Sequence, residues 1–127
     1  MPRVVWKNRP EADDFPNAGQ FLALVFPARE AARLVKALRR GKVVAHAGKD
    51  IFRASGLRLL PRDDPHVAAD LKKIARGKKL SPVLLVRGDA RRGLPLLIAD
   101  GYHRVCAAYH HDYDQPVPCI IVPRPKD

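Results

Sequence analysis

Two apolar segments joined by a short charged turn constrain the fold of this chain more than any other feature. Residues 82–87 read Pro-Val-Leu-Leu-Val-Arg, residues 94–99 read Leu-Pro-Leu-Leu-Ile-Ala, and a turn bounded by glycines separates them. Two such segments with a glycine-containing turn between them predict a β-hairpin. Because successive residues are apolar in both segments, we expect both strands to be buried on both faces.

The segments around this hairpin predict an α+β domain over residues 57–127. We expect a short strand at 57–60 and a helix that begins at Pro65 behind an Asp64 N-cap and ends at Gly77. A second helix is predicted at 102–110 and a last strand at 117–122. The expected order is therefore β-α-β-β-α-β.

Residues 1–56 predict a mostly helical, basic N-terminal extension. A polar loop is expected at 10–16, and the helices that follow are expected to begin near Pro16, at Pro27 and at Lys49. A length of 127 residues suits one domain with such an appendage.

The composition restricts the class of protein and of partner. No apolar run approaches the roughly 18 residues that cross a bilayer, and the N-terminus does not resemble a signal peptide, so we expect a cytoplasmic protein without a membrane partner. The formal net charge of +11 favours polyanions such as nucleotides or nucleic acid. The oligomeric state is left open.

The junction between the second hairpin strand and its helix is the strongest indication of a binding site. Strand residues 96–99 lead into Asp100 and Gly101 and then directly into the helix. The first turn of a helix has N–H groups without intrahelical partners, and glycine lets an anion approach them. His103 and Arg104 would add charged hydrogen bonds. This pattern predicts a phosphate site; the alternative is a tight turn with a solvated arginine.

The whole region from Leu57 to Val122 resembles the domain shared by the chromosome-partition protein ParB and sulfiredoxin. The matching segments are 68–74 on a helix, Ser81-Pro82-Val83-Leu84-Leu85-Val86, the glycine-opened helix Asp100-Gly101-Tyr102-His103-Arg104 with the strand before it, and Val117-Pro118-Cys119-Ile120-Ile121-Val122. The resemblance implies a ParB/sulfiredoxin-like fold that binds a phosphate-bearing ligand, in particular a nucleotide, at this helix.

This sequence departs from both families at the motif itself. The ParB motif is Gly-Glu-Arg-Arg, whereas Gly101 is followed here by Tyr102, His103 and Arg104. We also expect no counterpart of the helix-turn-helix that ParB has beyond its last strand. The sulfiredoxin motif is Gly-Cys-His-Arg, and Tyr102 replaces its catalytic cysteine. A phenol cannot perform thiolate chemistry, so sulfiredoxin activity is excluded. The Asp-Gly-x-His-Arg form is also similar to ParB-like nuclease domains and free-serine kinases.

The first hypothesis is therefore a phosphate or nucleotide site with five ligand-binding residues: Gly101, Tyr102, His103, Arg104 and, from the preceding loop, Arg62. An enzyme of this kind would be a nucleotide phosphohydrolase, a phosphotransferase or a ParB-like nuclease. Asp100 is the candidate catalytic carboxylate and could bind a Mg²⁺ that accompanies the nucleotide; the alternative is an N-cap.

Two other groups of residues could bind a metal, but a structural role is expected for each. Asp63 and Asp64 could form a metal-binding pair, although capping of the next helix is the expected role. The zinc alternative combines His103, Cys106, His110 and Cys119. We expect instead that Cys106 packs toward the sheet and that His110 is solvated at the helix end, so no residue is assigned to a metal.

The second hypothesis is a non-catalytic DNA- or RNA-binding module. Its contacts would come from basic helix faces, which could equally be solvated surface: Arg29, Arg33, Lys36 and Arg40 in the extension, and Lys72, Lys73 and Arg76 in the domain. No aromatic residues are interleaved with them, so no platform for base stacking is expected.

Overall fold

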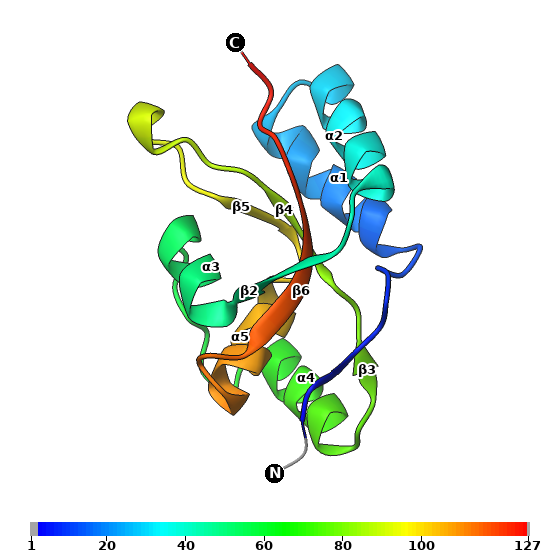
Figure 1. Ribbon diagram of the computed structural model, residues 1–127, viewed down its shortest axis with the longest axis vertical. Coiled ribbons are helices and arrows are strands. Elements are labelled where there is room, and N and C mark those ends of the chain that lie inside the picture. The colour runs from blue at the N-terminus through cyan, green and yellow to red at the C-terminus, as the bar shows by residue number, and fades with distance from the viewer. Residues whose placement is uncertain (1–2, 127) are drawn as a thin grey trace.

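The computed structural model describes residues 3–126 of the chain (Figure 1). Over these residues it has five α-helices: α1 (Asp14–Val25), α2 (Ala28–Arg40), α3 (Gly48–Ser55), α4 (Pro65–Ala75) and α5 (Tyr102–His111). The strands are β1 (Val5–Trp6), β2 (Val44–Ala47), β3 (Lys79–Leu80), β4 (Val83–Val86), β5 (Leu97–Asp100) and β6 (Pro116–Val122), and a 3₁₀ turn covers Ala90–Arg92.

The strands form mixed sheets, so the fold class is α+β as predicted. The main sheet has the order β2-β6-β4-β5, in which β4 runs parallel to β6 and the other pairs are antiparallel. Strands β1 and β3 form a separate parallel pair. The predicted hairpin is confirmed, because β4 and β5 are adjacent and antiparallel.

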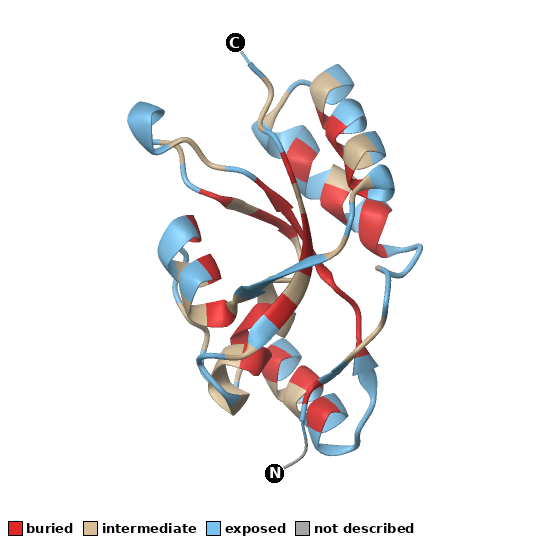
Figure 2. Ribbon diagram, viewed as in Figure 1, coloured by how far each residue is buried: buried red, intermediate tan, exposed pale blue. Residues whose placement is uncertain are grey.

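Helices cover both faces of the main sheet. Helices α1 and α2 pack on one face, through a cluster that includes Leu22, Leu38, Leu84 and Ile120. Helices α3 and α5 pack on the other face, and α4 packs against the outer side of α5 (Figure 1). All four residues of β4 are buried (Figure 2), which confirms the expected burial on both faces for this strand. The expectation is only partly correct for β5, whose first and last residues are half-buried because it is the edge strand.

The strand predicted at 57–60 is not formed. These residues belong to no helix or strand, and two of their carbonyl groups accept hydrogen bonds from side chains of α5: Leu60 O lies 2.7 Å from His110 Nε2, and Arg58 O accepts from the Tyr102 hydroxyl. Half-buried His110 is therefore not the solvated residue that the sequence suggested. The apolar residues of this segment suggested a strand. Leu59 and Leu60 are apolar because they pack against a core cluster that includes residues of α4 and α5.

The strand that pairs with β6 comes from the N-terminal extension. Every residue of β2 is exposed or half-exposed. The sequence of this strand therefore lacks the alternation of apolar and polar residues that predicts a strand. Residues on both sides of position 56 thus share one sheet, and α1 and α2 share a core cluster with β4 and β6.

Most helix boundaries agree with the sequence signals. The Asp64 carboxylate accepts hydrogen bonds from the amides of His66 at 2.9 Å and Val67 at 3.1 Å, which confirms it as the N-cap of α4. Gly56 and Gly77 adopt left-handed conformations just beyond α3 and α4. Over residues 3–126, no helix combines the length and the apolar character that crossing a bilayer demands.

Candidate functional site

A pocket of about 240 Å³ opens at the N-terminus of α5, where the sequence predicted a binding site. Helix α4 contributes residues spaced by three or four positions, which therefore share one face, and the junction between β5 and α5 contributes the rest. The lining residues are His66, Ala69, Asp70 and Lys73 of α4, and Asp100, Gly101, His103 and Arg104.

Gly101 makes the junction possible. Its φ of +105° lies in the left-handed region, and a Cβ at this position would lie 2.4 Å from Cγ1 of Val83. No side chain caps α5, so the amides of its first turn have no hydrogen-bond partner of this kind. The predicted transition from strand through glycine to helix is confirmed, and it brings the helix against β4.

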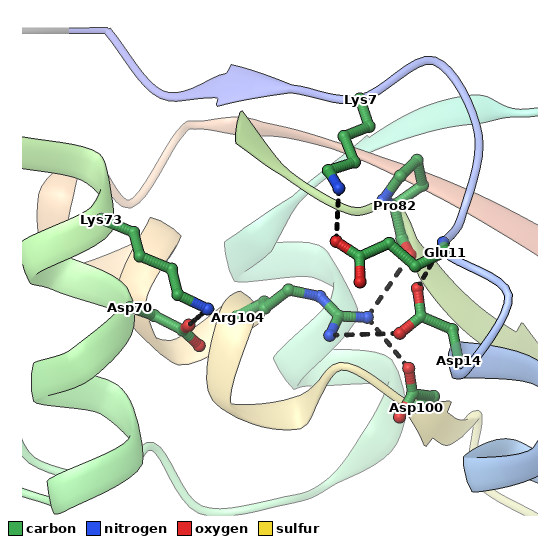
Figure 3. Close-up of polar contacts among 8 residues, drawn as sticks. All are labelled: Lys7, Glu11, Asp14, Asp70, Lys73, Pro82, Asp100 and Arg104. Atoms are coloured by element: carbon green, nitrogen blue, oxygen red, sulfur yellow. Dashed lines mark hydrogen bonds and ion pairs between the residues drawn. The ribbon is translucent and has the colours of Figure 1, made fainter. Parts of the chain in front are cut away.

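Two imidazoles and one ammonium group are the basic groups that line the pocket with Arg104. The rings of His66 and His103 lie 4.7 Å apart between centroids, inclined at 42°. Lys73, which also lines the pocket, has its Nζ atom 3.8 Å from Asp70 Oδ1 (Figure 3). His66 was not identified from the sequence, because its position depends on how α4 crosses α5, which local patterning does not reveal.

Arg104 lies at the pocket but is bonded to protein groups. Its Nη2 atom donates to Asp100 Oδ2 at 3.0 Å and to the Pro82 carbonyl at 3.4 Å, and its Nη1 atom lies 3.9 Å from Asp14 Oδ1 (Figure 3). The Arg104 side chain is only 17% exposed. Arg104 therefore joins α1, β5 and α5, and a phosphate would have to compete with two carboxylates for it.

The pKa of Asp100 is perturbed because its carboxylate and that of Asp14 are largely buried around the guanidinium of Arg104. Desolvation raises the pKa of Asp100 to about 6, against the lowering effect of Arg104 and with a further rise from Asp14. Asp14 was not singled out in the sequence because it falls in the polar segment 10–16, which was predicted to be a loop; α1 instead begins at Asp14. Asp100 consequently changes its protonation near neutral pH.

Asp70 is the second acid of the pocket. Burial raises the pKa of the Asp70 carboxyl, while Lys73 and Arg104 lower it. Each of the two pocket carboxylates therefore has a cation beside it.

The two remaining residues predicted to bind phosphate are directed elsewhere. The hydroxyl of Tyr102 donates to the Arg58 carbonyl, and the Tyr102 ring packs edge-on against Phe52 at 6.5 Å. Burial raises the pKa of Tyr102. Arg62 donates to the carbonyl of His110 at 2.7 Å, at the opposite end of α5. The structure thus brings His103, Gly101 and Arg104 together and leaves Arg62 outside the pocket.

The zinc alternative finds no support. Cys106 and Cys119 are both fully buried, but they belong to different core clusters, and burial raises the pKa of both thiols, that of Cys119 to about 11. Cys106 packs between α4 and α5 rather than on the sheet. Over residues 3–126, no three or more His, Cys, Asp or Glu residues are grouped to hold a metal, and Asp64 is occupied as an N-cap.

The basic residues are exposed but lie on separate layers. The α2 residues Arg29, Arg33, Lys36 and Arg40 are exposed on the helix pair that covers one face of the sheet. Lys72 and Lys73 of α4 and Arg76, just after this helix, are exposed beyond the other face, and among these three only Lys73 lines the pocket.

Comparisons with protein-family models, with curated proteins and with solved structures found no match to this chain. The resemblance to ParB and sulfiredoxin therefore depends on the sequence motifs alone.

Proposed function

We propose that this protein binds a phosphate-bearing ligand in the pocket at the N-terminus of α5. The observation that carries the proposal is the convergence, in one pocket, of an uncapped helix N-terminus with the two imidazoles of His66 and His103 and the ammonium group of Lys73. Helix N-termini favour anions through their free amides and dipole. The volume of about 240 Å³ is several times the roughly 30 Å³ of a water molecule, which is enough for a phosphoryl group.

The first-turn amides of α5 would hold the phosphate oxygens, with His103 and Lys73 on either side. Arg104 has a positioning role in this proposal, because it fixes Asp100 and the start of α5 while its Nη1 and Nη2 atoms contact protein groups. If the bound ligand undergoes a reaction, Asp100 is the group proposed to transfer a proton, since a pKa of about 6 gives access to both protonation states.

A Mg²⁺ ion in this proposal would come with the phosphates of a nucleotide. The acidic residues of the pocket are Asp70 and Asp100, and the described residues contain no metal-binding group of three or more. Both carboxylates would repel a phosphate when ionised, so affinity should fall as pH rises through about 6, the pKa of Asp100.

We also propose that the fold is of the ParB/sulfiredoxin kind. The order β2, α4, β4, β5, α5, β6 supports this when α3 and the short β1 and β3 strands are set aside, because it reproduces the expected β-α-β-β-α-β order with β2 as the first strand.

Thermal stabilisation at pH 6 by inorganic phosphate, pyrophosphate and ATP with Mg²⁺ tests the proposed site. A ligand at 100 times its dissociation constant adds about 2.7 kcal/mol to stability, and this gain should saturate. Lys73→Ala and His103→Ala should abolish most of it, whereas Lys72→Ala, which removes an exposed neighbour outside the pocket, should not. Equal responses from Lys73→Ala and Lys72→Ala would contradict the proposed site.

Binding of a nucleic-acid backbone by α2 is the second candidate function. The observation that favours it is that Arg29, Arg33, Lys36 and Arg40 are all exposed, and no ion pair joins any of them to a carboxylate within residues 3–126. Four phosphate contacts predict a slope of about −3 to −4 for the logarithm of the duplex-DNA binding constant against the logarithm of salt concentration. A charge-reversed α2 variant, Arg33→Glu with Lys36→Glu, should lose this slope; unchanged binding would exclude α2 as the contact surface.

A further inference from the structure

A second cavity runs along the outer edge of β5. Strand β5 is last in the sheet order, so its side away from β4 has no neighbouring strand in the main sheet. A groove of about 410 Å³ follows this edge and is lined by the continuous segment 95–103, together with Phe21, Ser55 and Leu57. Because consecutive residues before, within and after β5 line the groove, it runs parallel to this edge strand and could hold an extended polypeptide.

The hydrogen bonds of the neighbouring strands show which backbone groups of β5 face the groove. The amide of Arg87 donates to the Val122 carbonyl of β6 at 2.9 Å, so the preceding residue, Val86, directs its backbone groups toward β5, where it pairs with Leu97. Because directions alternate along a strand, Ile98 directs its N–H and C=O away from β4 and into the groove.

Residue 96 confirms this direction independently. The Leu96 amide already donates outward, to the Ala54 carbonyl at the end of α3, at 3.0 Å. An irregularity follows at Ala99, where the register between β4 and β5 shifts between Leu84 and Leu85. The Leu96 amide is therefore already paired on this edge, and Ile98 is the residue whose outward backbone groups an added strand would meet, just before the bulge.

The walls of the groove are apolar and come from opposite faces of the sheet. Phe21 of α1 is 37% exposed and Leu57, after α3, is 43% exposed, both unusually open for large apolar side chains. Because the walls stand on either side of the edge, a single strand fits between them. A second copy would bring walls of its own, and a net charge of +11 opposes self-association.

We infer that this groove docks an extended, acidic segment of a partner polypeptide as an added strand beside β5. Ile98 would exchange backbone hydrogen bonds with the segment, one apolar side chain of which would lie between Phe21 and Leu57. The acidic character follows from the charge of this chain. The inference does not depend on the proposed phosphate site, although the two cavities share Asp100, Gly101 and His103.

Selection of a phage-displayed random dodecapeptide library on the full chain, followed by anisotropy titration of the enriched peptides, tests the inference. Enriched peptides should combine acidic residues with at least one large apolar residue. Phe21→Asp and Leu57→Asp should each weaken their binding at least tenfold. Leu24→Asp is the matched control, because Leu24 is on the same helix, 87% exposed and outside the groove.

Amide hydrogen exchange gives a second measurement, which does not require a substitution. The amide of Ile98 should gain protection when the peptide binds, as expected for a newly paired edge. The inference is overturned if no peptide is enriched above a selection on an unrelated basic protein. It is also overturned if Phe21→Asp binds as wild type, or if light scattering shows a dimer that Phe21→Asp dissociates. Retained peptide binding in Lys73→Ala separates this surface from the phosphate site.

Discussion

Replacement of Asp100 by asparagine should stabilise the protein at neutral and alkaline pH. The Asp100 side chain is 15% exposed, and its carboxylate and that of Asp14 face the single guanidinium of Arg104. Burial raises the pKa of Asp100 from an ordinary 3.8 to about 6. At about 1.4 kcal/mol for each tenfold change in proton affinity, the ionised form costs about 3 kcal/mol in the folded state.

The sign follows from which state holds the proton. Between pH 4 and pH 6 the folded chain keeps a proton on Asp100 that the unfolded chain has released, so stability falls as pH rises through this window and the full cost is present above it. Asp100→Asn cannot ionise and avoids this cost, while its amide oxygen can still accept from Arg104.

Urea unfolding followed by circular dichroism between pH 4.5 and pH 8, in buffers without phosphate, measures this effect. Asp100→Asn should be more stable than wild type by only about 1 kcal/mol at pH 4.5, and this difference should grow to about 3 kcal/mol at pH 8. Asp63→Asn, which removes an exposed carboxylate, controls for the change in net charge. Parallel profiles for wild type and Asp100→Asn would refute the reasoning.

Three further predictions concern the same junction. Arg104→Met should destabilise the chain by about 3–5 kcal/mol at pH 8, because it leaves Asp14 and Asp100 without their cation; a loss below 1 kcal/mol in urea unfolding would show that the ion cluster is not structural. Adding Asp100→Asn to Arg104→Met should recover part of this loss, and strict additivity of the two changes would contradict a shared cluster. Gly101→Ala should cost about 2–5 kcal/mol, since a φ of +105° and a Cβ 2.4 Å from Val83 both oppose it; a melting temperature equal to wild type would contradict this.

The elements that the sequence predicted best are those with strong local signals. The hairpin was predictable because β4 and β5 are continuous apolar segments with a glycine-bounded turn between them, and α4 was predictable from Asp64 and Pro65. Strand β2 was missed because an exposed edge strand needs no apolar alternation, and its pairing with β6 is set by tertiary contacts. The prediction of a strand at residues 57–60 was wrong because a short apolar segment can pack against helices without pairing in a sheet.

Only part of the candidate site could be predicted from the sequence. The junction at Gly101 is local, so its conformation and the open helix N-terminus could be predicted from consecutive residues. The contributions of His66 and Lys73 depend on how α4 packs on α5, and that of Asp14 depends on how α1 packs against β5; no spacing in the sequence encodes either. The same packing explains why Arg104, predicted as a phosphate ligand, is bonded to carboxylates.

The most direct test of the central claim is a ¹H–¹⁵N chemical-shift titration of the protein with pyrophosphate at pH 6. The amides of Gly101, His103 and Arg104 should show the largest changes, the changes should saturate, and Lys73→Ala should remove them. Changes that gather on α2, or that rise linearly without saturation, would show that the anion binds the basic surface of the protein and not the start of α5.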